Sequence, residues 1–141
     1  MNSFQDCLKK GKIKNISRGK TLVKKELGLA KDDLNFATKS YRGKNYRWSI
    51  IQTYFSMFHS ARSLLYNRNY REHSHFCLIE AVKELYVKSG KISIIIIESL
   101  IKAKHLREAA DYYGDFSELN ANKLLKNAKD FLDVVKKIIQ N

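Results

Sequence analysis

Proline is absent from this chain, and glycine occurs only six times in 141 residues. Proteins rich in β-sheet need many such residues at their tight turns, whereas a chain without proline can continue each helix uninterrupted. Hydrophobic residues make up 44% of the sequence, which is normal for a folded domain and argues against a disordered chain. The composition therefore favours α-helices joined by short loops.

The most apolar part of the sequence, residues 46–67, has helical spacing on more than one face. One stripe comprises Trp48, Ile51, Phe55, Phe58 and Leu65, and its neighbour comprises Ile50, Tyr54, Met57, Ala61 and Leu64. A helix with so wide an apolar surface is contacted on several sides. We expect this helix at the centre of the fold, and we interpret the aromatic residues mostly as core rather than as a platform for stacking bases.

Helical periodicity also predicts the segments around this central helix. The other predicted helices cover residues 19–41, 75–88, 92–112 and the stretch after 117, where Leu125, Ala128, Leu132, Val135 and Ile139 are regularly spaced. Within residues 4–14 we expect only one or two helical turns, ended by Gly11. Gly43 should close the helix at 19–41, Ser74 should cap the helix at 75, and Ser117 or Asp115 should cap the last one. We predict an all-α fold, an antiparallel up-and-down bundle of four to five helices in one domain spanning residues 1–141. Residues 1–18 would form a short basic segment packed on or flanking this bundle.

The net charge of +13 is concentrated in the N-terminal half of the sequence. Residues 1–70 contain 15 lysines and arginines against four carboxylates, and residues 71–141 contain 12 against ten. Such a field would attract polyanions and speed their encounter with the protein. Solvated lysines without a dedicated ligand explain the same composition equally well, and the sequence does not separate these two interpretations.

The two cysteines, Cys7 and Cys77, are far apart and form no CxxC pattern. We therefore expect reduced thiols in a cytoplasmic protein. The N-terminus lacks the apolar segment of a signal peptide, and the apolar run at 92–101 is much shorter than the ~20 residues needed to cross a bilayer. We expect a soluble protein that makes no membrane contact.

The polar loop after the central helix contains Arg68, Asn69, Arg71, His73 and His75. RNA cleavage without a metal needs a base, an acid and a cation that stabilises the charged phosphorane, and histidine and arginine suit these roles. Arg68 with His73 or His75 is therefore a candidate catalytic set, and Asn69 and Arg71 are candidate binding residues. The alternative is that His75 packs at the start of its helix while the arginines are solvated.

A second polar cluster, Arg107–Tyr113, lies near the end of the helix predicted at 92–112. Arg107 and Asp111 are four residues apart and can form an ion pair, with Tyr112 beside them. This edge could bind an anion or dock a protein, or it could simply hold the turn to the last helix. His59 is expected to be a hydrogen-bonded core residue. No His, Cys or acidic cluster has metal-ligand spacing, so we predict neither a metal nor a cofactor.

Several stretches in this order resemble HEPN domains of the small, stand-alone prokaryotic kind over nearly the whole chain. They are Phe4–Gly11, Tyr54–Arg62, Tyr70–His75, Leu106–Tyr112 and Ala128–Leu132. The resemblance implies a helical bundle, frequently a homodimer, and a partner that is a minimal nucleotidyltransferase in a toxin–antitoxin pair. In catalytic members the Arg…His motif lies late in the bundle, where this chain has Arg107 and tyrosines but no histidine.

Two functional hypotheses follow from the resemblance and the polar clusters. In the first, the protein is a non-catalytic module that binds a nucleotide, a nucleic acid or a nucleotidyltransferase partner through its basic half and the edge formed by Arg107, Asp111 and Tyr112. In the second, it is a metal-independent endoribonuclease toxin using Arg68 with His73 or His75. The second hypothesis requires Arg68 and a histidine within hydrogen-bonding reach of one phosphate.

Overall fold

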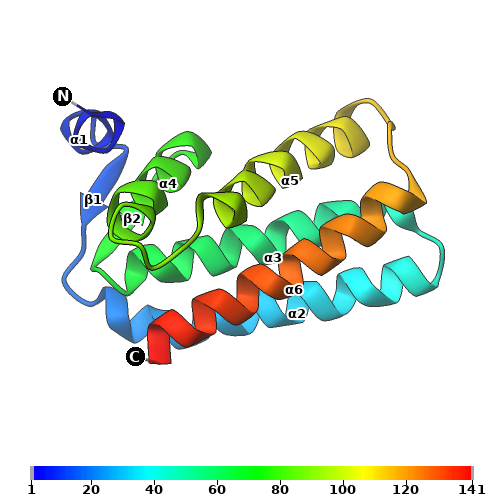
Figure 1. Cartoon of the computed structure of the whole chain (residues 1–141), viewed down its shortest axis with the longest axis horizontal. Coiled ribbons are helices and arrows are strands. Elements are labelled where there is room, and N and C mark those ends of the chain that lie inside the picture. The colour runs from blue at the N-terminus through cyan, green and yellow to red at the C-terminus, as the bar shows by residue number, and fades with distance from the viewer. Residues whose placement is uncertain (1, 141) are drawn as a thin grey trace.

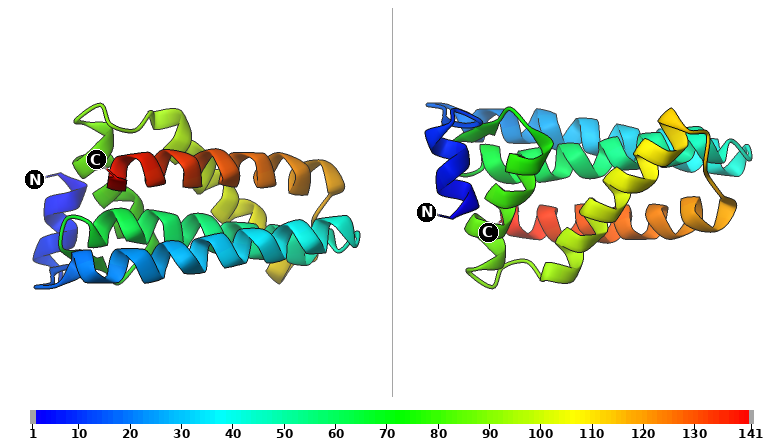
Figure 2. Two further views of the ribbon diagram at one scale, coloured as in Figure 1. Left: turned by 90° about the horizontal axis from the view of Figure 1, so that it is seen from below. Right: turned by 90° about the horizontal axis from the view of Figure 1, so that it is seen from above.

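The computed structural model describes residues 2–140, and four long helices run along its length (Figure 1). They are α2 (Val23–Arg42), α3 (Tyr46–Tyr66), α5 (Ile94–Tyr112) and α6 (Glu118–Gln140). Helices α2, α3 and α6 lie side by side, whereas α5 crosses them obliquely (Figure 2). The predicted all-α bundle is confirmed. Across residues 2–140, no helix combines the length and the apolar character that crossing a membrane requires.

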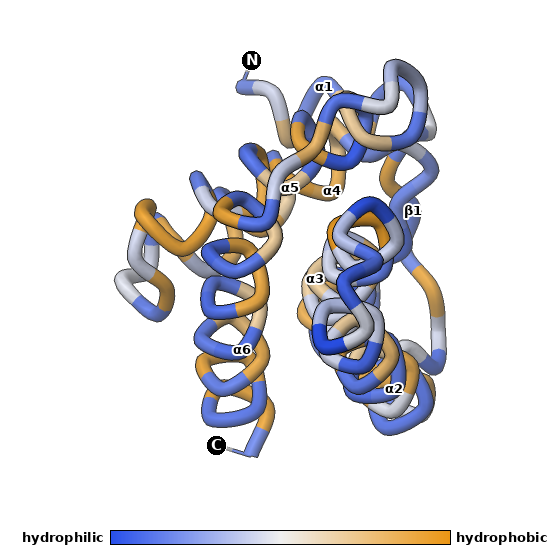
Figure 3. Tube along the Cα trace, turned by 90° about the vertical axis from the view of Figure 1, so that its right-hand side faces the viewer, coloured by the Kyte–Doolittle hydropathy of each residue, from blue (hydrophilic) through white to orange (hydrophobic). Residues whose placement is uncertain are grey.

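Helix α3 is the centre of the bundle, as its two apolar stripes indicate. Most of its side chains are buried, including small polar ones such as Ser49, Ser56 and Ser60, whose hydroxyls donate to backbone carbonyls. The apolar sides of α6 and of the α2–α3 pair face each other across the core (Figure 3). Burial of the α6 stripe against this core is what makes the amphipathic helix stable in the fold.

The helix ends are formed by the residues that the sequence predicts. Gly43 follows α2, the Ser74 hydroxyl accepts a hydrogen bond from the Cys77 amide at 3.0 Å, and the Ser117 hydroxyl accepts one from Asn120 at 3.1 Å. The helix expected at 75–88 is divided into α4 (His75–Val82) and a π-helical segment, η2 (Lys83–Val87). Likewise, the helix expected at 19–41 begins with a 3₁₀ turn, η1 (Gly19–Leu22).

Two short strands occur in segments for which the sequence predicts no strand. After α1 (Ser3–Lys9), β1 (Ile13–Asn15) pairs antiparallel with β2 (Tyr70–Glu72), with Lys14 opposite Arg71. The helical turns expected from residue 4 do end before Gly11, but the expectation that 67–74 is only a loop is wrong. Each strand is stabilised by a partner more than 50 residues away in sequence, so local periodicity does not reveal it.

The two cysteines are joined in a disulfide, so the expected reduced thiols are wrong. Cys7 in α1 and Cys77 in α4 have Cα atoms 5.9 Å apart and are separated by 70 residues. Both side chains are buried, and α1 packs against α4 at the same end of the bundle as the two strands (Figure 1). Pairing requires this tertiary proximity, which the spacing of the cysteines does not disclose.

Candidate functional site

The predicted catalytic residues lie in the segment that follows α3 and at the start of α4. Arg68 and His73 are exposed, whereas His75 is half-buried at the start of α4 and its Nδ1 atom is hydrogen-bonded to the hydroxyl of Tyr54. In residues 2–140, neither hydrogen bond nor ion pair connects Arg68 with His73 or His75. The assignment of catalysis to these three residues stays a prediction.

The surroundings of His75 favour its neutral form. Its ring stacks on that of Tyr54, with centroids 5.8 Å apart, and lies 4.8 Å from the ring of Phe58. Burial lowers the pKa of His75, and the positive charges of Lys104 and Arg107 act in the same direction. Burial also raises the pKa of the Tyr54 phenol, which therefore keeps its proton. A neutral imidazole next to a phenol can accept a proton, as a general base must.

Arg107 reaches the same tyrosine from α5. Its guanidinium carbon lies 5.8 Å from the ring centroid of Tyr54, 5.5 Å from that of Phe55 and 5.3 Å from that of Tyr112. Its Nε atom is buried without a hydrogen-bond partner, and one Nη donates to the Tyr112 hydroxyl at 3.2 Å. The structure therefore brings together, around Tyr54, an arginine and a histidine that belong to different sequence clusters.

The predicted ion pair between Arg107 and Asp111 is present and includes a second arginine. Asp111 lies 3.4 Å from Arg107 and also 3.4 Å from Arg47, which is near the start of α3. The Nε of Arg47 donates to the Ala110 carbonyl at 2.9 Å and thereby caps the end of α5. One carboxylate thus serves two guanidinium groups. Arg47 was not singled out from the sequence, where it is one basic residue among many.

Exposed aromatic rings surround this arginine pair. Trp48 is 49% exposed, Tyr112 63% and Tyr113 82%, and the Arg47 guanidinium lies 5.8 Å from the Trp48 ring centroid. The interpretation of the aromatic residues as core is therefore wrong at this end of the bundle. Apolar spacing along a helix does not show where neighbouring helices stop covering it, so Trp48 resembles a core residue in the sequence.

Asn69 and Arg71, the other predicted binding residues, lie at the opposite end of the bundle. Asn69 has a positive φ of 61°, and its side chain accepts a hydrogen bond from the Gly19 amide at 3.0 Å. Arg71 donates to the Tyr66 hydroxyl at 2.7 Å. Asn69 therefore holds a turn, and its role in binding stays a prediction separate from the Arg107 cluster.

The carboxylates of Glu26, Asp33 and Glu72, which lie against α3, are paired with basic side chains of that helix. His59 forms a hydrogen bond with Glu26 at 2.5 Å and lies 3.5 Å from Asp33, as expected for a hydrogen-bonded core histidine. Arg62 makes a two-pronged bond to Glu72 at 3.0 and 2.8 Å. Burial raises the pKa of Asp33, while the neighbouring His59 opposes that shift. This network holds α2, α3 and β2 together.

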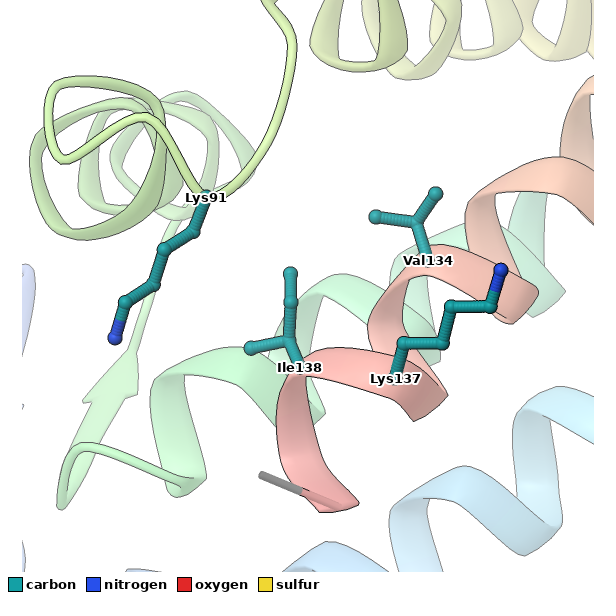
Figure 4. Close-up of a pocket in the computed structure, with 4 residues that line it drawn as sticks. All are labelled: Lys91, Val134, Lys137 and Ile138. Atoms are coloured by element: carbon teal, nitrogen blue, oxygen red, sulfur yellow. The ribbon is translucent and has the colours of Figure 1, made fainter.

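An open pocket of about 380 Å³ lies between α6 and the loop before α5 (Figure 4). Lys91, Val134, Lys137 and Ile138 line it, and the two lysine side chains extend in different directions. It contains no acid–base pair and offers no convergent anion site. Within residues 2–140, no group of three or more His, Cys, Asp or Glu side chains is arranged to hold a metal ion.

Comparison with known proteins identifies the family of this fold. The model of the HEPN domain matches residues 23–138. A protein of Methanocaldococcus jannaschii named "Putative toxin MJ0605" is 30% identical over 79% of this chain and 84% of its own length. A second protein of that organism, "Putative toxin MJ0142", is 23% identical over 86% of this chain and 84% of its own length. These matches cover the central helices and the Arg107 cluster, and the chain belongs to the HEPN family.

Proposed function

We propose that this HEPN protein is the toxin-like member of a toxin–antitoxin pair and binds the phosphate groups of a nucleotide or RNA at the Arg107 end of the bundle. The names of its relatives support the first part of this proposal, because both contain the word toxin. The HEPN resemblance supplies the expected partners: a minimal nucleotidyltransferase and a second copy of the chain. The binding site itself is argued from the side chains at the end of α5.

The observation that carries the binding proposal is the sharing of Asp111 by Arg47 and Arg107. Both arginine–carboxylate distances are 3.4 Å, longer than an optimal charge-assisted hydrogen bond. The Asp111 carboxylate therefore neutralises only part of the positive charge, and a phosphate could complete the coordination of the two guanidinium groups. Exposed rings at Tyr112 and Trp48 provide flat apolar surface for a base.

A metal-independent endoribonuclease is the second candidate, and one observation favours it. Arg107 and the neutral His75 contact the same Tyr54 ring, so a cation and a base converge there although they are far apart in sequence. Arg107 would stabilise the charged phosphorane, and His75 would take the 2′-hydroxyl proton and then return it to the 5′-oxygen that leaves as the P–O bond breaks. In this arrangement Arg107 takes the role of stabilising the phosphorane, which the sequence analysis assigns to Arg68.

Binding of ATP, used as the nucleotide probe, can be measured by calorimetry with the wild-type protein and Arg107→Ala. We expect the substitution to weaken binding about tenfold or more, because a charged hydrogen bond to a phosphate contributes roughly 1.5–3 kcal/mol. Lys102→Ala is the matched control, since Lys102 is an exposed cation on the same helix. Equal affinities for Arg107→Ala and Lys102→Ala would refute the Arg107 site.

The ribonuclease candidate is tested by incubating RNA with the protein in EDTA. If it is correct, His75→Ala and Arg107→Ala lose cleavage while Arg68→Ala and His73→Ala retain it. If Arg68→Ala and His73→Ala instead lose RNA cleavage while Arg107→Ala keeps it, catalysis belongs to the set predicted from the sequence, Arg68 with His73 or His75. If neither the wild type nor any variant cleaves RNA, but nucleotide binding depends on Arg107, the protein is the non-catalytic binding module.

A further inference from the structure

The two-stranded ribbon has one buried face and one basic face. Ile13 and Glu72 are directly opposite each other on the buried face and are 1% and 4% exposed. Because side chains alternate along a strand, Lys14 and its partner Arg71 project from the other face. His73 continues β2 on this outer face, since its amide donates to the Lys12 carbonyl at 2.7 Å.

Cations directly opposite each other in an antiparallel pair repel and destabilise the ribbon unless something neutralises them. Lys14 and Arg71 are such a pair, and in residues 2–140 neither forms an ion pair with a carboxylate. The nearest acid in the strands, Glu72, points to the other face and is held by Arg62 at 2.8 Å. The fold therefore concentrates positive charge here without supplying its own counter-charge.

A hollow of about 410 Å³ adjoins this face and is bordered by Arg18 and Arg71. The rest of its lining, from Ile16 to Leu22, contains no acidic residue. One Nη of Arg71 is fixed by its hydrogen bond to the Tyr66 hydroxyl at 2.7 Å. The Nε atom of the same side chain is buried and has no hydrogen-bond partner. Arg71 is thus a positioned guanidinium at the wall of a solvent-open hollow.

A second hollow, which Arg71 also lines, is bordered by Lys25 and Glu26. The Glu26 carboxylate does not cancel the charge of the ribbon, because it is engaged by His59 at 2.5 Å and by Arg62 at 3.7 Å. The basic residues therefore continue from the strands towards α2.

We infer that this surface, the ribbon face formed by Lys12, Lys14, Arg18, Arg71 and His73, binds consecutive phosphates of a single-stranded RNA backbone. A row of separated cations fits a chain of phosphates better than it fits one small anion, since alternate residues of a strand are roughly 7 Å apart. Lysine and arginine contacts to phosphate carry no sequence information, and the tyrosine beside Arg71, Tyr66, is buried and so is not available to stack on a base.

The ribbon face is separate from the Arg107 site and does not rest on it. The strands lie at the end of the bundle where α1 and α4 meet, and the end of α5 lies at the opposite end (Figure 1). RNA bound at the ribbon face would therefore have to extend along the bundle to reach Arg107. Each surface can therefore be tested by substitutions that leave the other surface intact.

The test is fluorescence anisotropy of a labelled short single-stranded RNA, titrated with protein over a series of salt concentrations. Lys14→Gln/Arg18→Gln removes two exposed cations of the ribbon face. We expect weaker binding and a slope of log K against log salt that is smaller by roughly 1.4, because each phosphate contact on a single strand contributes about 0.7. Lys126→Gln/Lys129→Gln removes the same charge from exposed positions on α6 and should leave both quantities unchanged.

Circular dichroism melting of both double variants checks that they remain folded. Equal losses in the ribbon and α6 variants would overturn the inference, because total charge alone would then explain binding. RNA binding that is lost in Arg107→Ala but retained in the ribbon variant would also overturn it, while supporting the proposed function. Binding to anionic lipid vesicles with none to RNA would assign the surface to a membrane and likewise refute the inference.

Discussion

The imidazole of His75 lies between Tyr54 and Phe58, and these surroundings connect its protonation to the stability of the fold. Burial lowers the pKa of His75 from the ordinary value of 6.5. The unfolded chain therefore takes up a proton at this residue at a higher pH than the folded protein does. Its contribution to stability is complete above pH 6.5 and is lost as the pH falls through the lowered pKa.

We expect the free energy of unfolding of the wild type to fall more steeply than that of His75→Gln as the pH is lowered below about 6.5. Urea denaturation at several pH values measures both curves, and their difference removes the contributions of the other three histidines. Parallel curves, or an NMR titration placing the pKa of His75 above 6.5, would contradict the assignment.

At the scale of single residues, the sequence predicted the contacts that are local. The Arg107–Asp111 pair follows from helical spacing, and the caps at Ser74 and Ser117 follow from residue type. The contact of His75 with Tyr54 and the sharing of Asp111 with a second arginine could not be predicted, because each joins different helices. A residue pattern constrains neighbours along the chain, whereas the packing of helices decides the rest.

At the scale of elements, Gly19 fixes how η1 meets the end of α3. A Cβ atom at this position would clash with the Tyr66 carbonyl oxygen and come within 2.9 Å of the Asn69 Cα, and both are backbone atoms. We expect Gly19→Ala to lower the free energy of unfolding by about 1–3 kcal/mol, the typical cost of overpacking. Gly28→Ala is the control, because that glycine lies inside α2 with no neighbouring atom within 4 Å.

The control substitution should change stability in the opposite direction. Replacing glycine by alanine in an exposed helix interior is expected to stabilise by roughly 0.5–1 kcal/mol. Urea denaturation of both variants measures the two effects under identical conditions. A Gly19→Ala variant as stable as Gly28→Ala would show that η1 can move away from α3, and the packing described here would then not determine its position.

The elements differ in how much of them the sequence could predict. The long helices have repeated apolar positions within the segment itself, so their existence and approximate bounds follow from periodicity. Strands β1 and β2 are three residues each and exist through their pairing with each other. For this reason the sequence shows the ribbon face only as an N-terminal surplus of charge and as the separate candidates Arg71 and His73, without joining the two.

At the scale of the whole molecule, the disulfide between Cys7 and Cys77 closes a loop that contains β1, α2, α3 and β2. It connects α1 to α4, so it holds the N-terminal segment against the bundle at the end that carries the ribbon face. In the chain-entropy account, closing a loop of this length stabilises the folded state by about 4 kcal/mol, because it restricts the unfolded chain. Proteins of this size commonly have total stabilities of only about 5–15 kcal/mol, so the disulfide is a large part of the total.

We therefore expect the melting temperature of the oxidised wild type to fall markedly when a reductant is added. Cys7→Ser/Cys77→Ser should melt near the reduced wild type and should not respond to reductant, which separates loss of the disulfide from unspecific effects of the reagent. Thiol titration of the unfolded, unreduced protein should find no free thiol. Two free thiols and identical melting with and without reductant would show that the cysteines are unpaired in solution. In that case α1 and β1 would be held to the bundle only by their apolar contacts and by the ribbon's hydrogen bonds.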